Sequence, residues 1–367
     1  MGIRGGAKNY FTTKLLACPN SGIARVHLSA FRGKRIAIDW ANISHRFLCR
    51  SKNPTEFRNE FINLIHKFAK YGIEFMFIFD GYPGEKKKQT LEYRKTARNK
   101  ILKKIGDIIE NVSNPEEDFE TILHLSKRVK TLNPLHVFEC KKLFDTIGIQ
   151  YIHLEDIEAD SIFKLLLDYD IANVCFSGDM DLLAFGCQKI ILDLNFKEDT
   201  VIDINLQKLL THLNVSQSQL LSAFVLSGTD WNNGIKNSNF EKNLELIKLY
   251  GEIPCVLDNL CKINSDLPED RQISIPNRFD WEFSISVYSE LLGCDVLQRI
   301  QAMLEQEKKQ IKRLQLLDGF NTLLEYGKSV LDGDSNFKYT RKYQEYIHWK
   351  YAFRLNLIPS CAYKPKN

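Results

Sequence analysis

The sequence predicts an α/β protein with an open, mostly parallel sheet, helices on both faces of that sheet and a helical C-terminal region. Two observations support this prediction. Short apolar runs rich in Ile, Val and Phe alternate with stretches of helical period, and the strand signals stop at about residue 216. A chain of 367 residues, 44% of them hydrophobic, is also long enough to bury the large core that such a fold needs.

The predicted strands are continuous apolar runs, which is typical of parallel strands buried on both faces. They cover residues 34–39, 73–80, 149–154, 173–179 and 189–194. Between them lie stretches of helical period, such as 56–70 and 159–167. The alternation of the two kinds of segment is the pattern of an open α/β sheet.

Two interruptions organise the chain further. A turn-rich segment around Pro115 divides a basic helical stretch, and a polar, Pro-containing connection covers 262–278. We therefore expect an α/β core over 1–215 with a helical insertion at about 84–140, a helical region over 216–355 and a disordered tail over 356–367.

Charge is distributed unevenly. The formal net charge is only +4, but residues 86–104 hold nine Lys or Arg and a single acid, Glu92. This segment predicts a local positive field that would attract polyanions.

The nine cysteines form no CxxC pair and no Cys/His cluster at zinc-ligand spacing, which argues against a zinc site. No apolar run reaches the length of a membrane span, and the N-terminus has no signal-peptide pattern, so we expect a protein that is neither membrane-bound nor secreted.

Acidic residues recur where the predicted strands end. Asp39, Asp80 and Asp179 each finish such a strand, and the carboxyl ends of parallel strands meet along one edge of a sheet, where ligands bind. The acids expected to meet at this edge are Asp39, Asp80, Glu158, Asp160, Asp179, Asp181 and Asp230.

Seven carboxylates in one crevice repel each other strongly unless cations neutralise them. Because every candidate ligand is an oxygen, the expected ions are two Mg²⁺, for which Mn²⁺ could substitute. Two such ions about 4 Å apart would hold the attacking water and the leaving oxygen of a phosphodiester. Taken singly, an Asp at a strand end is more often a turn or capping residue, and Glu158 and Asp160 could simply favour a helix N-terminus. Their joint occurrence favours the metal site.

Motifs along the chain match one family. They are MGIRGGAK, IAIDWANISHRFL, FIFDGYPGEKK, IEADSIFKLL with CFSGDMDLLAFG, and LSGTDWNNGIK. With these motifs the chain resembles the flap endonuclease/XPG family of structure-specific 5′ nucleases from its first residues to about Asn259, and more loosely through its helical end. A compact chain of this kind is also similar to the versions carried by large DNA viruses.

The resemblance implies a PIN-like nuclease core in which the seven acids are the metal-site residues. Glu158, Asp160, Asp179 and Asp181 are then the leading direct or water-mediated ligands. The insertion corresponds to a helical arch that admits a single-stranded 5′ flap. Lys87 and Arg94 lie seven residues apart on one helix face, where they would act as the catalytic electrostatic clamp on the scissile phosphate.

DNA contacts follow from the same resemblance. The residues expected to bind DNA are Gly2, His45, Arg98, Gly234 and Lys236, with Lys103, Lys104, Lys127, Arg128 and Lys130 as weaker candidates. His45 stands where the family commonly has an aromatic residue that stacks on a base, although an ordinary surface histidine fits the pattern equally well.

The clearest departure from the family is the segment 234–243. Asn237, Ser238 and Asn239 stand where the family's helix-two-turn-helix has glycines, so we count potassium binding as doubtful. Because Asn tolerates left-handed backbone, the turn itself could be kept. No convincing sliding-clamp motif is present: Gln344, Ile347 and Tyr351 only approximate one, so a sliding clamp is an open partner.

The function expected is a monomeric, magnesium-dependent 5′ flap endonuclease with 5′ to 3′ exonuclease activity, acting near single-strand/double-strand junctions in replication or repair. Its location would be the nucleus, or the host nucleus or cytoplasm for a viral protein. The alternative is a catalytically weak or inactive DNA-binding scaffold with the same fold. A gap-specific or RNA-tolerant exonuclease stays open, whereas a junction resolvase and a PIN-type RNase fit the arch segment less well.

Overall fold

The computed structural model describes residues 3–81, 88–111, 114–290 and 292–311. The chain divides into two compact units, each considered by itself below. The first comprises residues 1–43, 67–90 and 150–306, and the second comprises 44–66, 91–149 and 307–367. Within the described ranges, no helix is both long and apolar enough to cross a lipid bilayer.

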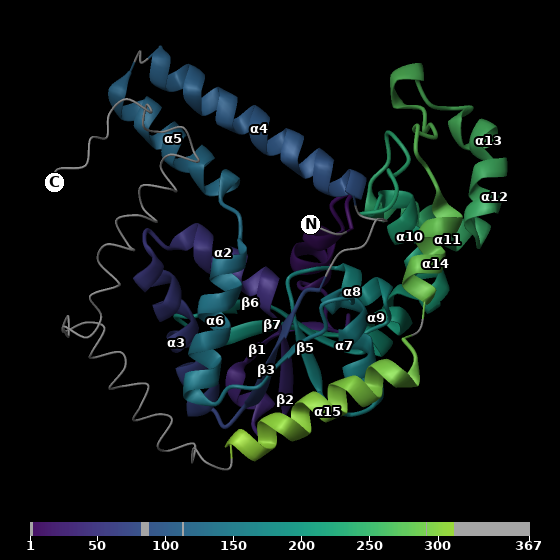
Figure 1. The fold of residues 1–367 in the computed structure, drawn as a ribbon. Helices are drawn as coiled ribbons and strands as arrows, with labels where there is room; N and C mark the ends of the chain where they lie inside the picture. Colours follow the sequence, from purple (N-terminus) through teal and green to yellow (C-terminus); the bar gives the residue numbers. More distant parts are fainter. Residues whose placement is uncertain (1–2, 82–87, 112–113, 291, 312–367) are drawn as a thin grey trace. The chain divides into compact units, whose positions relative to one another are not determined.

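A seven-stranded sheet forms the centre of the first unit (Figure 1). Its strands are β1 (Ile23–His27), β2 (Arg35–Asp39), β3 (Glu74–Phe79), β4 (Tyr151–His153), β5 (Val174–Phe176), β6 (Lys189–Asn195) and β7 (Thr200–Asn205). The order is β1-β7-β6-β5-β2-β3-β4, with β6, β5, β2, β3 and β4 parallel. These five are the predicted strands, so the mostly parallel sheet is confirmed.

Two neighbouring strands at one end of the sheet were not predicted. β7 pairs antiparallel with β6, and β1 pairs antiparallel with β7. In β1 only Ile23 is buried, and in β7 the half-buried Asp203 interrupts the buried residues Val201, Ile202 and Ile204. A search for continuous apolar runs overlooks both strands.

Both faces of the sheet are covered. On one face Ala37, Met76 and Ile190 join a core with the helices that follow β4. On the other face Trp40 stacks on Phe79 with ring centroids 4.7 Å apart, and Phe68 contacts Phe176 at 6.3 Å. Because Trp40 opens helix α2 and Phe68 lies near the end of helix α3, helices contribute to both faces, as the sequence predicts.

The helices of the first unit share one core with the sheet. They are α1 (Ala7–Asn9), the π-helix η1 (Tyr10–Leu15), the 3-10 helix η2 (Leu28–Phe31), α7 (Ala159–Asp168), α8 (Asp181–Ala184), α9 (Leu206–Leu213), α10 (Gln217–Ser227), α11 (Phe240–Tyr250), α12 (Ile253–Asp258), α13 (Leu260–Asn264), η4 (Glu269–Arg271), α14 (Trp281–Ser289) and α15 (Cys294–Ile311). The helical character after residue 216 is thus confirmed for the described residues. The expected boundary near residue 215 does not coincide with a division between the two units.

The second unit is helical. It contains most of α2 (Trp40–Arg50), α3 (Pro54–Lys70) and α4 (Lys88–Glu110), with all of α5 (Pro115–Val129) and α6 (Pro134–Ile147). Phe61 of α3 touches Phe47 of α2 at 5.0 Å and Phe144 of α6 at 5.8 Å between ring centroids. These aromatic contacts hold three helices together, and α4 and α5 have a separate small core of Ile105, Leu125 and Val129.

Candidate active site

The acids at the carboxyl edge of the sheet are linked through hydrogen bonds. Asp39 ends β2, and both of its carboxylate oxygens are used: Oδ1 accepts from the backbone N–H of Asn42 at 2.9 Å, and Oδ2 accepts from the hydroxyl of Ser177 at 2.7 Å. The Ser177 hydroxyl oxygen in turn accepts the backbone N–H of Asp179 at 3.1 Å. Asp39, at the end of β2, and Asp179, in the loop after the neighbouring strand β5, are therefore joined through one serine.

The Gly178 peptide beside Asp179 is fixed from both sides. Its N–H donates to Asn42 Oδ1 at 3.0 Å, and its carbonyl accepts from the ammonium of Lys8 at 3.1 Å. A Cβ at Gly178 would lie 3.0 Å from the Asn42 side chain. Lys8 and Asn42 position the acidic turn and were not predicted as site residues. Both lie inside family motifs, but only their contacts reveal the role.

Asp80 connects β3 to the start of α7. Its Oδ1 accepts the backbone N–H of Ala159 at 3.2 Å, between Glu158, the residue before the helix, and Asp160 in its first turn. The next residue, Gly81, donates its N–H to the Ile157 carbonyl at 3.0 Å, and a Cβ there would lie 2.1 Å from Leu154 O. Only glycine fits so close to the backbone of the 154–157 loop.

Asp181 and Asp230 complete the set. Asp181 begins α8 and donates its backbone N–H to Asp179 Oδ1 at 3.2 Å. Asp230 follows α10, and its carbonyl accepts the hydroxyl of Thr90, the buried residue near the start of α4. Both acids are almost fully buried, with exposed fractions of 1% and 5%.

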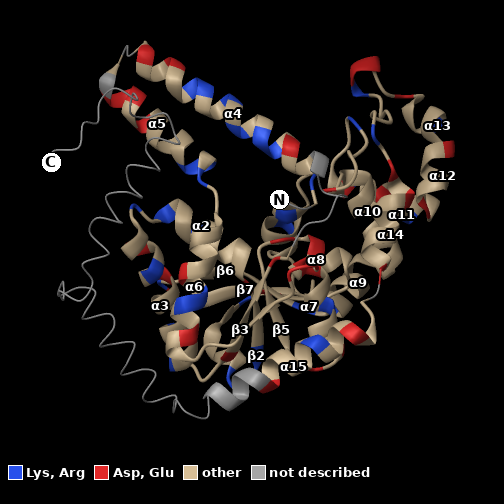
Figure 2. Ribbon diagram, in the orientation of Figure 1, with Lys and Arg blue, Asp and Glu red and all other residues tan. Residues whose placement is uncertain are grey.

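Electrostatic effects link most of the predicted acids. Burial and the nearby charges of Asp80 and Asp179 raise the pKa of Asp39 to about 7, against the opposing hydrogen bonds. Burial also raises the pKa of Tyr288 well above its ordinary value, as do Asp181, Asp179, Asp230 and Asp160. Six of the seven predicted acids thus share an electrostatic neighbourhood, and Glu158 adjoins it at the N-terminus of α7. Acidic positions gather beside α8 in Figure 2.

The chemistry of this site fits a hydrated divalent cation. Within the described part of the chain, no three Asp, Glu, His or Cys side chains lie close enough together to hold a metal ion. The available donors are carboxylate oxygens, and a buried carboxylate with the raised pKa of Asp39 gains from a nearby positive charge. Mg²⁺ usually keeps several of its waters and needs only one or two direct carboxylates.

The predicted basic residues lie on α4, in the second unit. Arg94 and Arg98 are both half-buried, and Lys and Arg recur along the middle of α4 in Figure 2, whereas its last turn contains none. Lys103, Lys104, Lys127 and Arg128 lie on α4 and α5. Lys87 and Gly2 fall outside the described residues, so the expected pairing of Lys87 with Arg94 stays a prediction.

His45 contacts the end of α5 instead of standing alone on its helix. Its Nε2 lies 3.3 Å from the carbonyl of Lys130, and its Nδ1 lies 3.8 Å from the sulfur of Cys49. The ammonium of Lys130 donates to the carbonyls of Leu48 at 3.0 Å and Ser51 at 2.7 Å. These contacts join α2 to α5, which gives His45 and Lys130 a structural role beside the DNA-binding role predicted for them.

The turn between α10 and α11 is held by a left-handed asparagine and its side-chain hydrogen bonds. Asn237 adopts a left-handed φ of 56°, and its side-chain amide donates to the carbonyls of Asp270 and Gln272. Gly234 packs so closely on Ser227 that a Cβ would lie 2.4 Å from its backbone, while Lys236 is exposed. Phe224 and Phe240 stack at 5.1 Å and join the two helices.

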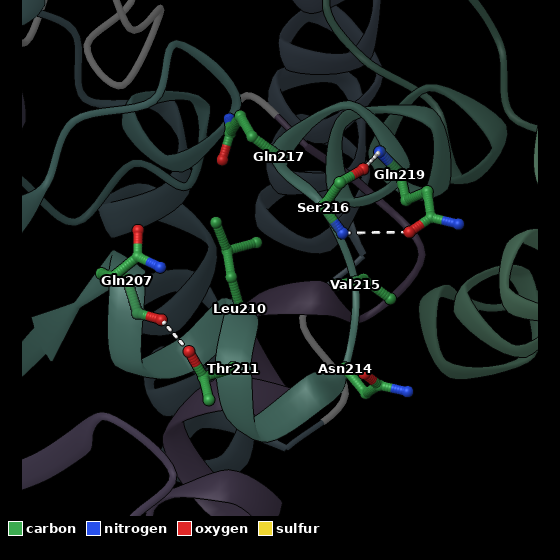
Figure 3. A pocket seen from close by; sticks show the side chains of 8 residues that line it. All are labelled: Gln207, Leu210, Thr211, Asn214, Val215, Ser216, Gln217 and Gln219. Carbon is green, nitrogen blue, oxygen red and sulfur yellow. Dashed lines mark hydrogen bonds between the residues drawn. The ribbon is translucent and has the colours of Figure 1, made fainter.

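A pocket of about 580 Å³ lies where α9 passes into α10 (Figure 3). It is lined by Gln207, Leu210, Thr211, Asn214, Val215, Ser216, Gln217 and Gln219. None of these side chains is charged and none is among the predicted site residues. The side-chain amide of Gln217 donates to the carbonyls of Leu183 and Ala184 in α8, the helix that Asp181 begins.

Comparison with known proteins identifies the family. Sequence models of the XPG N-terminal domain and the XPG I-region match residues 1–101 and 148–230, together just over half of the chain. "Flap endonuclease 1-A" of Oryza sativa subsp. japonica is 28% identical over 287 residues, covering 74% of this chain and 72% of that protein.

Solved structures show the same fold. The catalytic core of Rad2 in complex with DNA substrate superposes with a TM-score of 0.54 at 19% identity, covering 80% of this chain and 83% of that one. The Holliday junction-resolving enzyme GEN1, in complex with product DNA and Mg²⁺, gives a TM-score of 0.53 at 14% identity, covering 82% of this chain and 73% of that one. The PIN-like fold expected from the motifs is thus supported. With both family models on its sequence and this fold, the chain belongs to the flap endonuclease/XPG family of structure-specific 5′ nucleases.

Proposed function

We propose that this nuclease is a Mg²⁺-dependent 5′ flap endonuclease with 5′ to 3′ exonuclease activity, which hydrolyses DNA beside single-strand/double-strand junctions. The observation that carries the proposal is the convergence of acids from three parallel strand ends and two helix starts. Asp39 and Asp179 are joined through Ser177, and Asp80 reaches the start of α7. A buried group of carboxylates is costly unless a cation joins it.

The acids would have three roles. The direct or water-mediated ligands of two divalent ions would be Glu158, Asp160, Asp179 and Asp181, and Asp80 and Asp230 would complete the negative field. Both oxygens of Asp39 already accept hydrogen bonds from Asn42 and Ser177, so Asp39 would orient the Asp179 turn while adding its charge. When bound, such ions supply an activated water and neutralise the charge that develops on the phosphate.

The basic residues would act on the phosphate rather than on the metal. Arg94 and Lys87 would stabilise the negative charge that builds up on the scissile phosphate in the transition state. Arg98 and the remaining arch cations would guide the backbone of the flap, an attraction that weakens with salt. His45 and Gly2 would contact DNA near the cut.

Duplex DNA would bind at the turn between α10 and α11. Exposed Lys236 would contact a phosphate, and Gly234 keeps the loop close to α10. The amide of Asn237 closes this turn through the 270–272 carbonyls, which is a means of holding it without an ion, so potassium binding stays doubtful. The same proposal includes a monomeric state and a location in the nucleus, or in the host nucleus or cytoplasm for a viral protein. A sliding clamp stays an open partner.

The decisive experiment incubates the purified chain with a 5′-labelled flap duplex, a nicked duplex, a gapped duplex and a Holliday junction. With Mg²⁺ the flap should be cut near its junction to leave a 5′-phosphate, and EDTA should stop the reaction. Binding of the flap without cutting at any Mg²⁺ or Mn²⁺ concentration would instead support the alternative, a DNA-binding scaffold.

A further inference from the structure

Tyr288 is a buried tyrosine that lies against the acidic site. It belongs to α14, and only 5% of it is exposed. Its ring meets the Trp231 ring edge-on at 5.0 Å and the Phe185 ring at 4.9 Å between centroids. Trp231 directly follows Asp230, and Phe185 caps α8, the helix that Asp181 begins. The neighbours of two acids thus fix the position of this ring.

The hydroxyl of Tyr288 is buried and has no hydrogen-bond partner among the residues that the structure describes. An unsatisfied buried polar group costs about 1–3 kcal/mol. Phenylalanine would fill the same space against Trp231 and Phe185 without that cost. A buried donor of this kind requires an explanation, such as a partner that becomes available in another state of the site.

The contacts of the ring make a carboxylate the expected partner, because Phe185 ends the helix that Asp181 begins and Trp231 directly follows Asp230. Besides burial, the charges that raise the pKa of Tyr288 are those of Asp181, Asp179, Asp230 and Asp160. An ordinary tyrosine hydroxyl is protonated at neutral pH, so it interacts favourably with a carboxylate by donating a hydrogen bond. Asp181 has the largest effect of the four and is itself 1% exposed.

We propose that Tyr288 is a positioning residue of the metal site, whose hydroxyl donates a hydrogen bond to the Asp181 carboxylate when divalent ions draw the acids together. This inference rests on the proposed function. A hydrogen bond of this kind orients one carboxylate oxygen toward the ion, and losing such an outer partner typically weakens metal binding about 10- to 100-fold. Tyr288 lies more than 100 residues after Asp181, so none of the family motifs in the sequence contains it.

The test compares Tyr288→Phe with the matched control Tyr10→Phe in the full chain. Tyr10 also packs in an aromatic group, with Phe240 at 5.4 Å and Phe11 at 5.7 Å, but the charges that act on its hydroxyl come from groups outside the acidic site, Glu241 foremost. Mn²⁺ affinity is measured by calorimetry, and the melting temperature is measured with and without MnCl₂. Tyr288→Phe should bind Mn²⁺ about tenfold more weakly, whereas Tyr10→Phe should bind like the unmodified chain.

The metal-free melting temperature separates positioning from packing. Since Tyr288→Phe removes an unsatisfied buried hydroxyl, its metal-free melting temperature should equal or exceed that of the unmodified chain, while the rise caused by Mn²⁺ should shrink. Flap cutting by Tyr288→Phe should be slow at low Mg²⁺ and recover at high Mg²⁺.

Two results would overturn the inference: Mn²⁺ affinity equal to that of Tyr10→Phe, or a lower metal-free melting temperature with unchanged Mn²⁺ affinity. The proposed function fails in a different way, because the unmodified chain would then neither bind Mn²⁺ nor cut a flap. That outcome would remove both proposals together.

Discussion

The acids at the sheet edge and the cations of α4 and α5 are held in place by different means. Each of Asp39, Asp80 and Asp179 makes hydrogen bonds to backbone or hydroxyl groups of neighbouring strand ends and helix starts. The α4–α5 pair has only a small core around Ile105, and large apolar side chains such as Tyr93 and Phe119 are 68% and 63% exposed. Rigid scaffolding suits metal ligands, while loosely held helices suit binding of a long polyanion.

The largest effect should come from the acidic site. Asp179→Ala and Asp181→Ala should each abolish flap cutting, with a loss of at least about a hundredfold. Both variants should keep the fold, because removing one carboxylate relieves repulsion in a crowded anionic site. Circular dichroism and single-turnover cutting would be measured together. If either variant unfolds, the assumed repulsion is wrong.

In the basic helix the next largest effect is expected at Arg94. Arg94→Ala should lower the cutting rate about 100-fold at saturating DNA, because it would remove the positive charge that we propose stabilises the transition state, and the melting temperature should change little. Lys100→Ala, an exposed change on the same helix, is the matched control and should mainly weaken DNA binding in a salt-dependent way. Equal losses in the two variants would mean that the helix acts only as a general positive surface.

Gly81 tests how closely the acidic region is packed. Gly81→Ala should destabilise the fold by about 1–3 kcal/mol, because its Cβ would lie 2.1 Å from Leu154 O and 2.4 Å from Ile157 O. Urea denaturation gives this value. Gly106→Ala in α4 is the control, since nothing lies within 4 Å of its added Cβ, and it should stabilise the helix slightly. A tolerated Gly81→Ala would show that the 154–157 loop yields easily.

A pH effect is expected from His136 of the second unit. Burial lowers the pKa of His136 to about 4, and its Nδ1 accepts the backbone N–H of Asn133 at 3.2 Å as part of the α6 cap. The unfolded chain takes up a proton near pH 6.5 while the folded chain does so only near pH 4, so stability falls as the pH drops through that window. The loss is on the order of 2 kcal/mol.

Urea denaturation at pH 7 and at pH 4.5 measures this loss. His136→Gln keeps a capping side chain at that position but cannot titrate, so its stability should fall less between the two pH values. If the free energy of unfolding falls by the same amount between pH 7 and pH 4.5 in both proteins, His136 is not the group responsible.

The smallest effect is expected at Arg299. Its guanidinium binds both carboxylate oxygens of Asp156, at 2.6 and 2.9 Å, and so ties α15 to the loop before Glu158. Both side chains are largely exposed, so Arg299→Ala should cost less than about 1 kcal/mol and reduce cutting only a few-fold. A hundredfold loss in cutting would mean that α15 positions the Glu158 loop directly.

The positions of Asp39, Asp80 and Asp179 at the carboxyl edge of the sheet could be predicted because each stands at or just after the end of an apolar run that forms a strand. The strands β1 and β7 were missed because neither has a continuous apolar run: β1 is mostly exposed, and Asp203 interrupts the apolar residues of β7. Asn237 was correctly expected to tolerate left-handed backbone, but its bonds to the 270–272 carbonyls depend on a loop some 30 residues away.

Lys8, Asn42 and Tyr288 illustrate what sequence patterns leave out. Lys8 and Asn42 hold the Gly178 peptide from two distant elements, and no spacing rule connects residues 8, 42 and 178. In the sequence, Tyr288 looks like an ordinary core residue of an apolar helix. Only its buried hydroxyl, which has no hydrogen-bond partner among the described residues, distinguishes it. Groups that orient ligands are selected by tertiary contacts, so they become visible only in the folded chain.

The most direct test of the account is to locate divalent ions in crystals of the chain soaked in MnCl₂, using the anomalous signal of manganese. The account predicts one or two peaks surrounded by Glu158, Asp160, Asp179 and Asp181, and no such peaks in Asp179→Ala/Asp181→Ala crystals. Manganese bound elsewhere, in a protein that cuts flap DNA in the same solution, would contradict it.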